Sequence, residues 1–223
     1  MTTSDVPDAT TVDGQPALVA DGNFVKAGGV VTMVAPFVFV GALLSGTDLA
    51  NNTFDALGHL MYIVVVLVLY HVFRDGGPTI RLAAVMGVVG LLFITLTDFL
   101  GLAGVELAAQ SAAAGTTTPA IDAVGETVLV LRSHLETVGN ALAWGVGGGL
   151  FSLAMLRTNR LSKWLGWAGL LFAALMLASL FDVMFTPGGI RESPVFFLGN
   201  FFGRFWLVAL GIALVRFDTE SIP

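Results

Sequence analysis

The chain contains a run of twenty residues without a charge, from Thr137 to Leu156, and this run limits what the chain can fold into. About twenty mostly apolar residues are what one helix needs to cross a hydrocarbon core about 30 Å thick. Lipid offers no hydrogen-bond partners to the backbone, so a segment inside it has to satisfy its amides internally. We therefore expect this run to form a transmembrane helix that ends at Arg157.

Five further apolar segments of similar length accompany this run. Together they predict an all-α polytopic integral membrane bundle of six transmembrane helices, covering residues 23–217. The composition agrees, because 12% of the residues are charged, whereas soluble domains carry about 25%. In chain order the predicted spans are Phe24–Ser45, Asp55–Phe73, Ile80–Leu102, Glu136–Leu156, Trp164–Phe185 and Val195–Val215.

The segments outside these spans are expected to be polar or irregular. Residues 1–22, with four aspartates and two prolines, predict a flexible acidic cytoplasmic tail, and residues 218–223 predict a short C-terminal tail. The small residues of Ala103–Ala120 predict a long, mobile connection. From Ile121 onward apolar residues recur at helical spacing, so an amphipathic stretch is expected to lead into the fourth span.

The distribution of Lys and Arg predicts the orientation of the bundle, because cytoplasmic loops carry an excess of basic residues. Seven basic residues flank the termini and the even-numbered loops, whereas two lie on the other side. We therefore expect a multi-pass protein of the cell (plasma) membrane with both termini in the cytoplasm. The seven are Lys26, Arg74, Arg81, Arg157, Arg160, Lys163 and Arg216, and the two are Arg132 and Arg191.

The cysteine count and the charge balance exclude several classes of function. The chain has no cysteine, which excludes disulfides, thiolate metal sites and thiol catalysis. Its net charge of −6 excludes the basic surface that nucleic-acid binding requires. Because the polar segments are acidic and poor in lysine, we expect the source to be a halophile.

Arg204 is the most unusual residue within a predicted span, because it lies near the middle of the sixth segment. A charged side chain inside the bilayer is costly and needs a partner or water. Asn200 lies one helical turn before it on the same face. The acids predicted at a suitable depth to pair with Arg204 are Asp98, Glu136 and Asp182.

Five of the predicted helices place polar residues at a similar level in the outer half of the bilayer. We expect these residues to line a water-accessible pocket that opens outward. The alternative is structural: a few charges face the lipid headgroups, and one buried Arg–Asp pair holds the bundle together. The candidate pocket residues are His59, Asp98, Glu136, Asn140, Asp182, Asn200 and Arg204.

The histidines and the absence of catalytic motifs bear on cofactors. His59 and His134 could meet at one level as ligands of a haem, but their spacing matches no recognised motif. We therefore expect no metal and no cofactor, and keep haem as an alternative. No GxSxG, HExxH or Walker motif occurs, so the sequence gives no support for an enzyme.

Glycines spaced four apart predict where helices pack closely. Gly145 and Gly149 form one such pair in the fourth span, and Gly199 and Gly203 form another in the sixth. Small residues at this spacing let two helix backbones approach each other. Such faces serve packing within the bundle, against other membrane subunits, or in a homodimer.

The region around Arg157 carries a resemblance. The segment LRSHLETVGNAL leads into GVGGGLFSLAMLRTNRLSKWLGWAGLL, in which Arg157 ends one span, Asn159–Lys163 forms a short loop, and Leu165 and Gly166 open the next span. With its six-span layout, the chain resembles a family of uncharacterised prokaryotic (archaeal or bacterial) six-helix integral membrane proteins, a domain of unknown function. The resemblance implies this architecture and no particular activity.

Three classes of function are consistent with these features, and all of them take the lipid bilayer as a partner and no nucleic acid. In the first, the outward polar pocket receives a small molecule, an ion or a lipid. In the second, the protein is a non-enzymatic subunit of a larger membrane complex. In the third, it is a haem or quinone redox protein.

Overall fold

The structure is a computed structural model, and it describes residues 22–44, 46–115, 119–185 and 193–217. The predicted acidic tail, apart from Gly22, and the predicted C-terminal tail at 218–223 lie outside the described residues. Residues 186–192, between the fifth and sixth predicted spans, also lie outside them.

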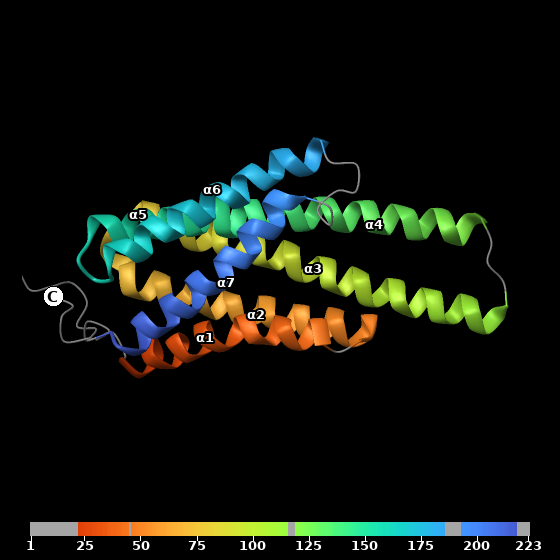
Figure 1. Cartoon of the computed structure of the whole chain (residues 1–223), viewed down its shortest axis with the longest axis horizontal. Helices are drawn as coiled ribbons and strands as arrows, with labels where there is room; N and C mark the ends of the chain where they lie inside the picture. Colours follow the sequence, from red (N-terminus) through yellow and green to blue (C-terminus); the bar gives the residue numbers. More distant parts are fainter. Residues whose placement is uncertain (1–21, 45, 116–118, 186–192, 218–223) are drawn as a thin grey trace, which may run out of the picture.

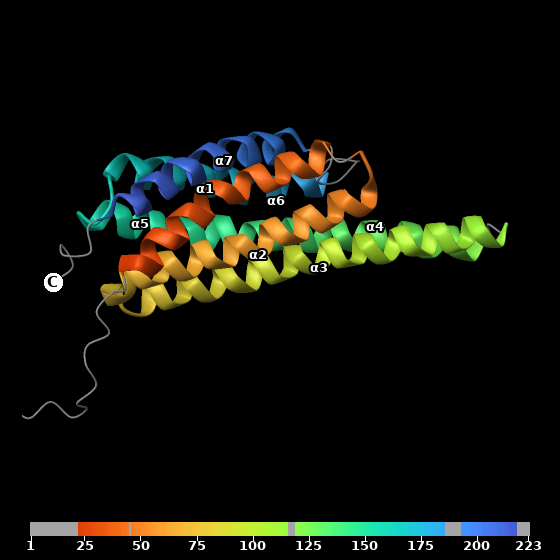
Figure 2. The same cartoon turned by 90° about the horizontal axis from the view of Figure 1, so that it is seen from below.

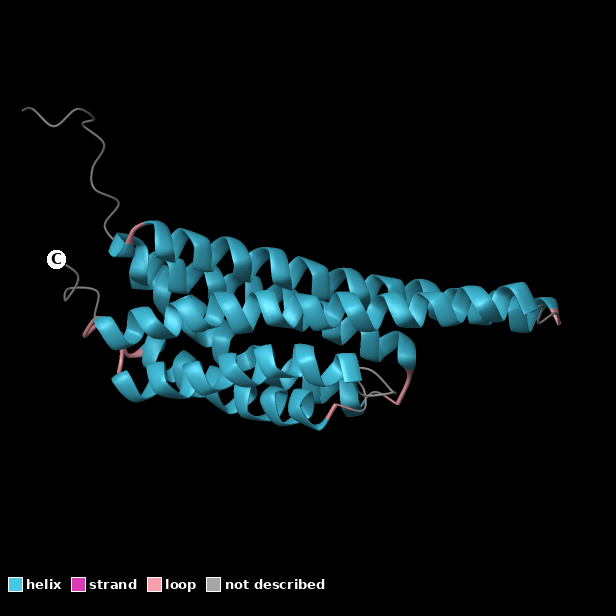
Figure 3. Ribbon diagram, turned by 90° about the horizontal axis from the view of Figure 1, so that it is seen from above, coloured by secondary structure: helices cyan, strands magenta, loops and turns pink. Residues whose placement is uncertain are grey.

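The described residues fold into a bundle of long helices, which confirms the predicted all-α class with six helices able to span a membrane (Figures 1 and 3). A π-helical segment, η2, connects α4 to α5 without a break, so these three elements form the fourth span. The elements are α1 (Gly22–Leu44), α2 (Asp48–Phe73), η1 (Arg74–Gly76), α3 (Pro78–Ala114), α4 (Pro119–Asn140), η2 (Ala141–Gly148), α5 (Gly149–Arg157), α6 (Lys163–Phe185) and α7 (Pro194–Val215).

Helix α2 begins seven residues earlier than the sequence predicted, at Asp48 instead of Asp55. Thr47 is its N-cap, and the Thr47 hydroxyl oxygen accepts a hydrogen bond of 3.3 Å from the amide of Ala50. A cap of this kind satisfies one of the free amides at a helix start. The prediction was wrong because the first two turns of α2 are polar, and polarity was taken as the end of the span.

Helix α3 and helix α4 form a hairpin that extends beyond the ends of the neighbouring helices (Figures 1 and 2). The sequence predicted an irregular connection over Ala103–Ala120, but α3 runs for 37 residues and ends at Ala114. Alanine, which dominates this segment, has the highest helix propensity of all residues. The helix stops at Gly115, whose φ of 65° lies in the left-handed region that glycine adopts readily.

The predicted close packing at glycines is confirmed, with α6 as the common partner. A Cβ atom added at Gly145 would lie 2.7 Å from the Leu177 side chain, and one at Gly203 would lie 2.4 Å from the Phe172 ring. The fourth span also approaches α3, since a Cβ at Gly90 would lie 2.4 Å from the backbone nitrogen of Ala143. At these glycines the helices of a single chain therefore approach so closely that a Cβ atom would clash with the neighbouring helix.

A row of aromatic rings crosses the bundle. It begins at Phe39 of α1, whose ring stacks on Tyr62 of α2 with 5.4 Å between centroids. Trp144 of η2 lies 5.2 Å from Tyr62, and Phe172 of α6 lies 5.7 Å from Trp144. Trp206 of α7 follows at 5.7 Å and donates a hydrogen bond to the backbone of α6. Five helical elements are thus tied together in the middle of the bundle.

The two ends of the bundle differ in character. At the end where α1 starts and α7 stops, Arg160 crosses from the α5–α6 loop to the end of α2. Its guanidinium donates to the carbonyl of Val72 and to Asp75, the latter at 2.7 Å. The other end carries the α3–α4 hairpin and a polar cavity. The outer faces of the helices between the two ends are lined with exposed apolar side chains, as lipid contact requires.

Candidate functional site: a polar cavity beside the helical hairpin

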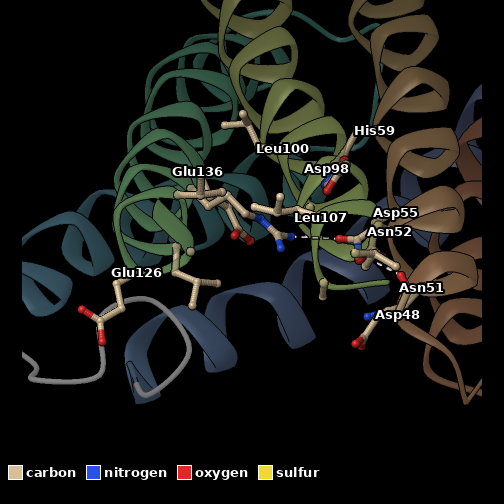
Figure 4. Close-up of a pocket in the computed structure, with 18 of the residues that line it drawn as sticks. Asp48, Asn51, Asn52, Asp55, His59, Asp98, Leu100, Leu107, Glu126 and Glu136 are labelled. Carbon is tan, nitrogen blue, oxygen red and sulfur yellow. Dashed lines mark hydrogen bonds and ion pairs between the residues drawn. The ribbon is translucent and has the colours of Figure 1, made fainter. Parts of the chain in front are cut away.

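A cavity of about 1220 Å³ opens among the helices at the end of the bundle that carries the α3–α4 hairpin. Side chains from α1, α2, α3, α4 and α7 line it. Figure 4 shows its polar residues projecting from α2, α3 and α4 into a shared space. A cavity of this size exceeds the range of about 300–1,000 Å³ that is usual for small-molecule sites.

Six of the seven candidate pocket residues line this cavity, and the structure thereby brings together side chains from four helices. They are His59, Asp98, Glu136, Asn140, Asn200 and Arg204. Whether they form a binding site stays a prediction, because a shared cavity establishes their proximity and not a ligand.

Asp182, the seventh candidate, does not line the cavity. It lies on α6, from which no described residue contributes to the cavity wall. Its carboxylate accepts a hydrogen bond from the hydroxyl of Ser193, the N-cap of α7. The face of α6 on which it lies could not be inferred from the sequence, and Asp182 serves to join α6 to α7.

His59 and Asp98 form the closest polar contact in the cavity wall. The imidazole Nδ1 of His59 donates to a carboxylate oxygen of Asp98 at 2.8 Å. Asp98 is buried, with 4% of its surface exposed, so the histidine supplies the partner that a buried carboxylate needs. The Phe39 and His59 rings pack in a T-shaped arrangement, with 5.0 Å between the ring centroids.

Arg204 has a different neighbour from the one that the sequence predicted. It makes no ion pair within 4.0 Å with Asp98, Glu136 or Asp182 in the described part of the chain. Its guanidinium carbon instead lies 5.4 Å from the centre of the Phe39 ring, a cation–π arrangement. The expected ion pair is therefore absent from the described residues: Asp98 contacts His59, Asp182 contacts Ser193, and Glu136 faces the cavity without contacting Arg204.

Helix α4 contributes a polar stripe to the cavity wall, formed by Arg132, Glu136 and Asn140. The guanidinium of Arg132 donates to the side-chain oxygen of Asn52 on α2 at 3.0 Å, the contact drawn in Figure 4. The amide of Asn140 donates to the backbone carbonyl of Glu136, at 2.9 Å. The Glu136 carboxylate itself receives no hydrogen bond from the described residues.

The structure also adds polar residues that the sequence interpretation missed. Asp48, Asn51, Asn52 and Asp55 of α2 all line the cavity, and so does Glu126 near its rim. Asn52, Asp55 and His59 recur at i, i+3 and i+7, which places them on one face of a helix. That spacing could have revealed them, but the first turns of α2 were assigned to the preceding loop.

The outer part of the cavity follows the hairpin and is largely apolar. Residues of α3 and α4 form this wall. They include Leu107, Ala108, Ile121, Val128 and Leu129. The cavity therefore combines a polar inner part with a largely apolar wall along the hairpin, and the exposed acids Asp48 and Glu126 also line it.

The histidines considered as haem ligands lie in different surroundings. His59 faces the cavity, whereas His134 is exposed on α4 and bonds the carbonyl oxygen of Val130 in its own helix, at 2.8 Å. Within the described residues, no group of three or more His, Asp or Glu side chains is arranged to hold a metal ion. Haem binding stays a prediction.

Comparison with known proteins places the chain in a family. No curated protein and no solved structure matches it. Residues 49–212, which include five of the six spans and most of the cavity wall, match the family described as "Domain of unknown function (DUF4386)". This match confirms the resemblance to an uncharacterised family of membrane proteins, and the chain belongs to the DUF4386 family.

Proposed function

We propose that the protein binds a small polar molecule in the cavity, which it reaches from the side of the membrane opposite to the termini. The observation that carries the proposal is that Arg204, Asp55 and Glu136 all face one cavity without contacting an opposite charge among the described residues. A membrane protein retains such costly groups where they contact water or a substrate.

The distribution of basic residues supports an outward opening. Arg74, Arg81, Arg157, Arg160 and Lys163 flank the connections at the end opposite to the cavity. An excess of Lys and Arg marks the cytoplasmic side. We accordingly assign the protein to the plasma membrane, with the cavity facing out and the chain ends in the cytoplasm.

A ligand screen with a blocked cavity tests the proposal. A Cβ at Gly104 would meet no atom within 4 Å, and Gly104 lines the cavity, so Gly104→Trp fills the space without a clash at its base. Polar compounds are screened for an increase in melting temperature of the detergent-solubilised protein. A ligand at about 100 times its Kd adds about 2.7 kcal/mol of stability.

We expect ligands that stabilise the wild type and the Asp182→Asn variant but not the Gly104→Trp variant. Asp182→Asn is the matched control, because this residue is polar and intramembrane but lies outside the cavity. Ligands that stabilise all three proteins equally would place binding elsewhere and contradict the proposal.

The projecting hairpin favours a second candidate, a subunit that docks another protein beyond the membrane surface. Val124, Val130 and Leu131 are each about half exposed on α4, at 52%, 58% and 47%. Apolar residues exposed on the outer face of a helix are typical of a surface that packs against a partner. Purification from native membranes, with and without a Val130→Glu substitution, tests whether a stoichiometric partner depends on this face.

A further inference from the structure

We infer that the ligand of this cavity is a zwitterion, with an ammonium group and an anionic oxygen group in the same molecule. The inference rests on the proposed function, since it specifies the chemistry of the molecule that the cavity binds. It follows from the charges that the protein leaves without a contacting partner inside one cavity.

The negative pole consists of Asp55 and Glu136. Figure 4 shows them projecting from α2 and α4 toward the same space. Neither carboxylate has a hydrogen bond or an ion pair with a described residue. Glu136 lies deep in the bundle and still keeps accessible surface, because it faces the cavity.

The other carboxylate at this depth does not belong to the negative pole. Asp98 is buried and already holds the imidazole of His59 at 2.8 Å. The two remaining acids of the wall, Asp48 and Glu126, are exposed. Asp55 and Glu136 are therefore the carboxylates for which a bound ammonium group would supply the missing partner.

The positive pole is Arg204 on α7. Its guanidinium has five donors and cannot lose its proton, yet the cation–π contact with Phe39 satisfies none of these donors. Arg132 is less available, because one of its nitrogens is used by Asn52. Asn200, one turn from Arg204, adds a side-chain amide to the same wall.

Opposite charges in one cavity would normally pair with each other, but these do not come into contact. Asp55 is within electrostatic reach of Arg204 and of Arg132, while no ion pair within 4.0 Å joins them. A ligand with a single charge would satisfy one pole and leave the other uncompensated in a partly desolvated site, which is costly. A zwitterion satisfies both poles at once.

Two sources could supply this chemistry: a free zwitterionic metabolite, or the zwitterionic headgroup of a lipid. The apolar wall formed by Leu107, Val128 and Leu129 could accommodate a hydrocarbon chain attached to the charged groups. The shared feature of both sources is the pair of opposite charges, and a chain-length comparison distinguishes them.

Four probes test the inference on the purified full-length protein in a neutral detergent. They are hexyl phosphoethanolamine, which has both charges, hexylamine, hexyl methyl phosphate, which as a diester carries one negative charge, and phosphoethanolamine without a chain. Binding is measured by calorimetry, and binding within the cavity is defined by its loss in Gly104→Trp. We expect the tighter-binding zwitterion to have a Kd at least about tenfold lower than that of either single-charge probe. This ratio corresponds to a difference of about 1.4 kcal/mol in binding free energy.

Variants assign the poles. Glu136→Gln or Asp55→Asn should abolish the advantage of hexyl phosphoethanolamine over hexyl methyl phosphate, and Arg204→Gln should abolish its advantage over hexylamine. Glu106→Gln, on the hairpin but outside this cavity, should change neither ratio. If a variant does not fold, the ranking of the four probes on the wild type decides.

The outcomes separate the two proposals. Tighter binding of hexyl phosphoethanolamine than of phosphoethanolamine supports a lipid headgroup, and equal binding supports a free zwitterion. A single-charge probe that binds as tightly as the zwitterions overturns the inference but leaves a ligand-binding cavity. If no probe shows binding that is lost in Gly104→Trp, the inference is overturned. The proposed function then loses the support of these four probes, and the wider ligand screen decides it.

Discussion

The imidazole Nδ1 of His59 donates a hydrogen bond to the buried Asp98 carboxylate at 2.8 Å, and this contact joins α2 to α3 in the wall of the cavity. Removing the acid leaves the imidazole without its partner and breaks the link between the two helices. We predict that Asp98→Ala lowers the free energy of unfolding by about 1–2 kcal/mol, at the upper end for interhelical hydrogen bonds in membranes.

Thermal unfolding in detergent measures this effect. Gln110→Ala is the control, because Gln110 is exposed on the same helix and bonds only within it, to Glu106. Equal melting temperatures for Asp98→Ala and Gln110→Ala would show that the His59–Asp98 contact does not hold the helices together.

Close packing between α3 and the fourth span can be tested at two glycines of α3. A Cβ at Gly90 would lie 2.4 Å from the Ala143 nitrogen and 2.5 Å from the Gly139 oxygen, and these backbone atoms cannot move aside alone. Gly90→Ala should destabilise by about 1–3 kcal/mol through overpacking. Gly104→Ala meets no atom and should be neutral or stabilising by up to about 1 kcal/mol. Melting temperatures in detergent compare the two variants, and a similar loss of stability for both would contradict the observed packing.

The cytoplasmic end, as we assign it, depends on Arg160. Its guanidinium donates both to the Val72 carbonyl and to Asp75. We predict that Arg160→Ala costs about 1–2 kcal/mol, whereas Asp75→Asn costs no more than about 1 kcal/mol because Asp75 is exposed. The melting temperature should therefore fall further for Arg160→Ala than for Asp75→Asn. Added salt should reduce the Asp75 effect proportionally more than the Arg160 effect, because Arg160→Ala also loses the bond to the Val72 carbonyl. Equal losses of stability from both variants at all salt concentrations would show that the bond to the Val72 carbonyl contributes nothing.

Ser193 caps α7 and also donates to Asp182, so we predict that its role is structural. Ser193→Ala should lower the free energy of unfolding by about 1 kcal/mol, as for other lost caps. Ser193→Thr should retain most of the stabilisation that the cap provides. Neither variant should change the affinity for a cavity ligand measured by calorimetry. A change in that affinity would place Asp182 and Ser193 in the site after all.

The six spans could be predicted because a charge-free run of apolar residues leaves few alternatives to a membrane helix. The hairpin could not, since the Ala103–Ala114 segment is too polar for a predicted span yet consists of strong helix formers. Hydropathy measures the preference of a segment for lipid, whereas helix propensity measures the preference of its backbone for the helical conformation. In this segment the hydropathy is low and the helix propensity is high.

Six residues of the cavity wall were chosen from the sequence, but the direction in which each side chain faces could not be predicted. Counting residues from the span ends places Asp98, Asp182 and Arg204 at a comparable level. The rotation of each helix about its axis, which the sequence leaves open, decides that Asp182 faces Ser193 and that Arg204 faces Phe39. Asp55 was missed for a related reason, because a polar residue near a span end was taken as its boundary.

The central claim, a water-filled cavity open to the outside, is tested most directly by thiol accessibility, because the chain has no cysteine of its own. Asn200 lines the cavity, whereas its neighbour Phe201 is exposed on the outer face of α7, where lipid would cover it. The account predicts that Asn200→Cys reacts with a membrane-impermeant maleimide in intact cells and that Phe201→Cys does not. An Asn200→Cys variant that stays unreactive, or that reacts only after the cells are permeabilised, would contradict it.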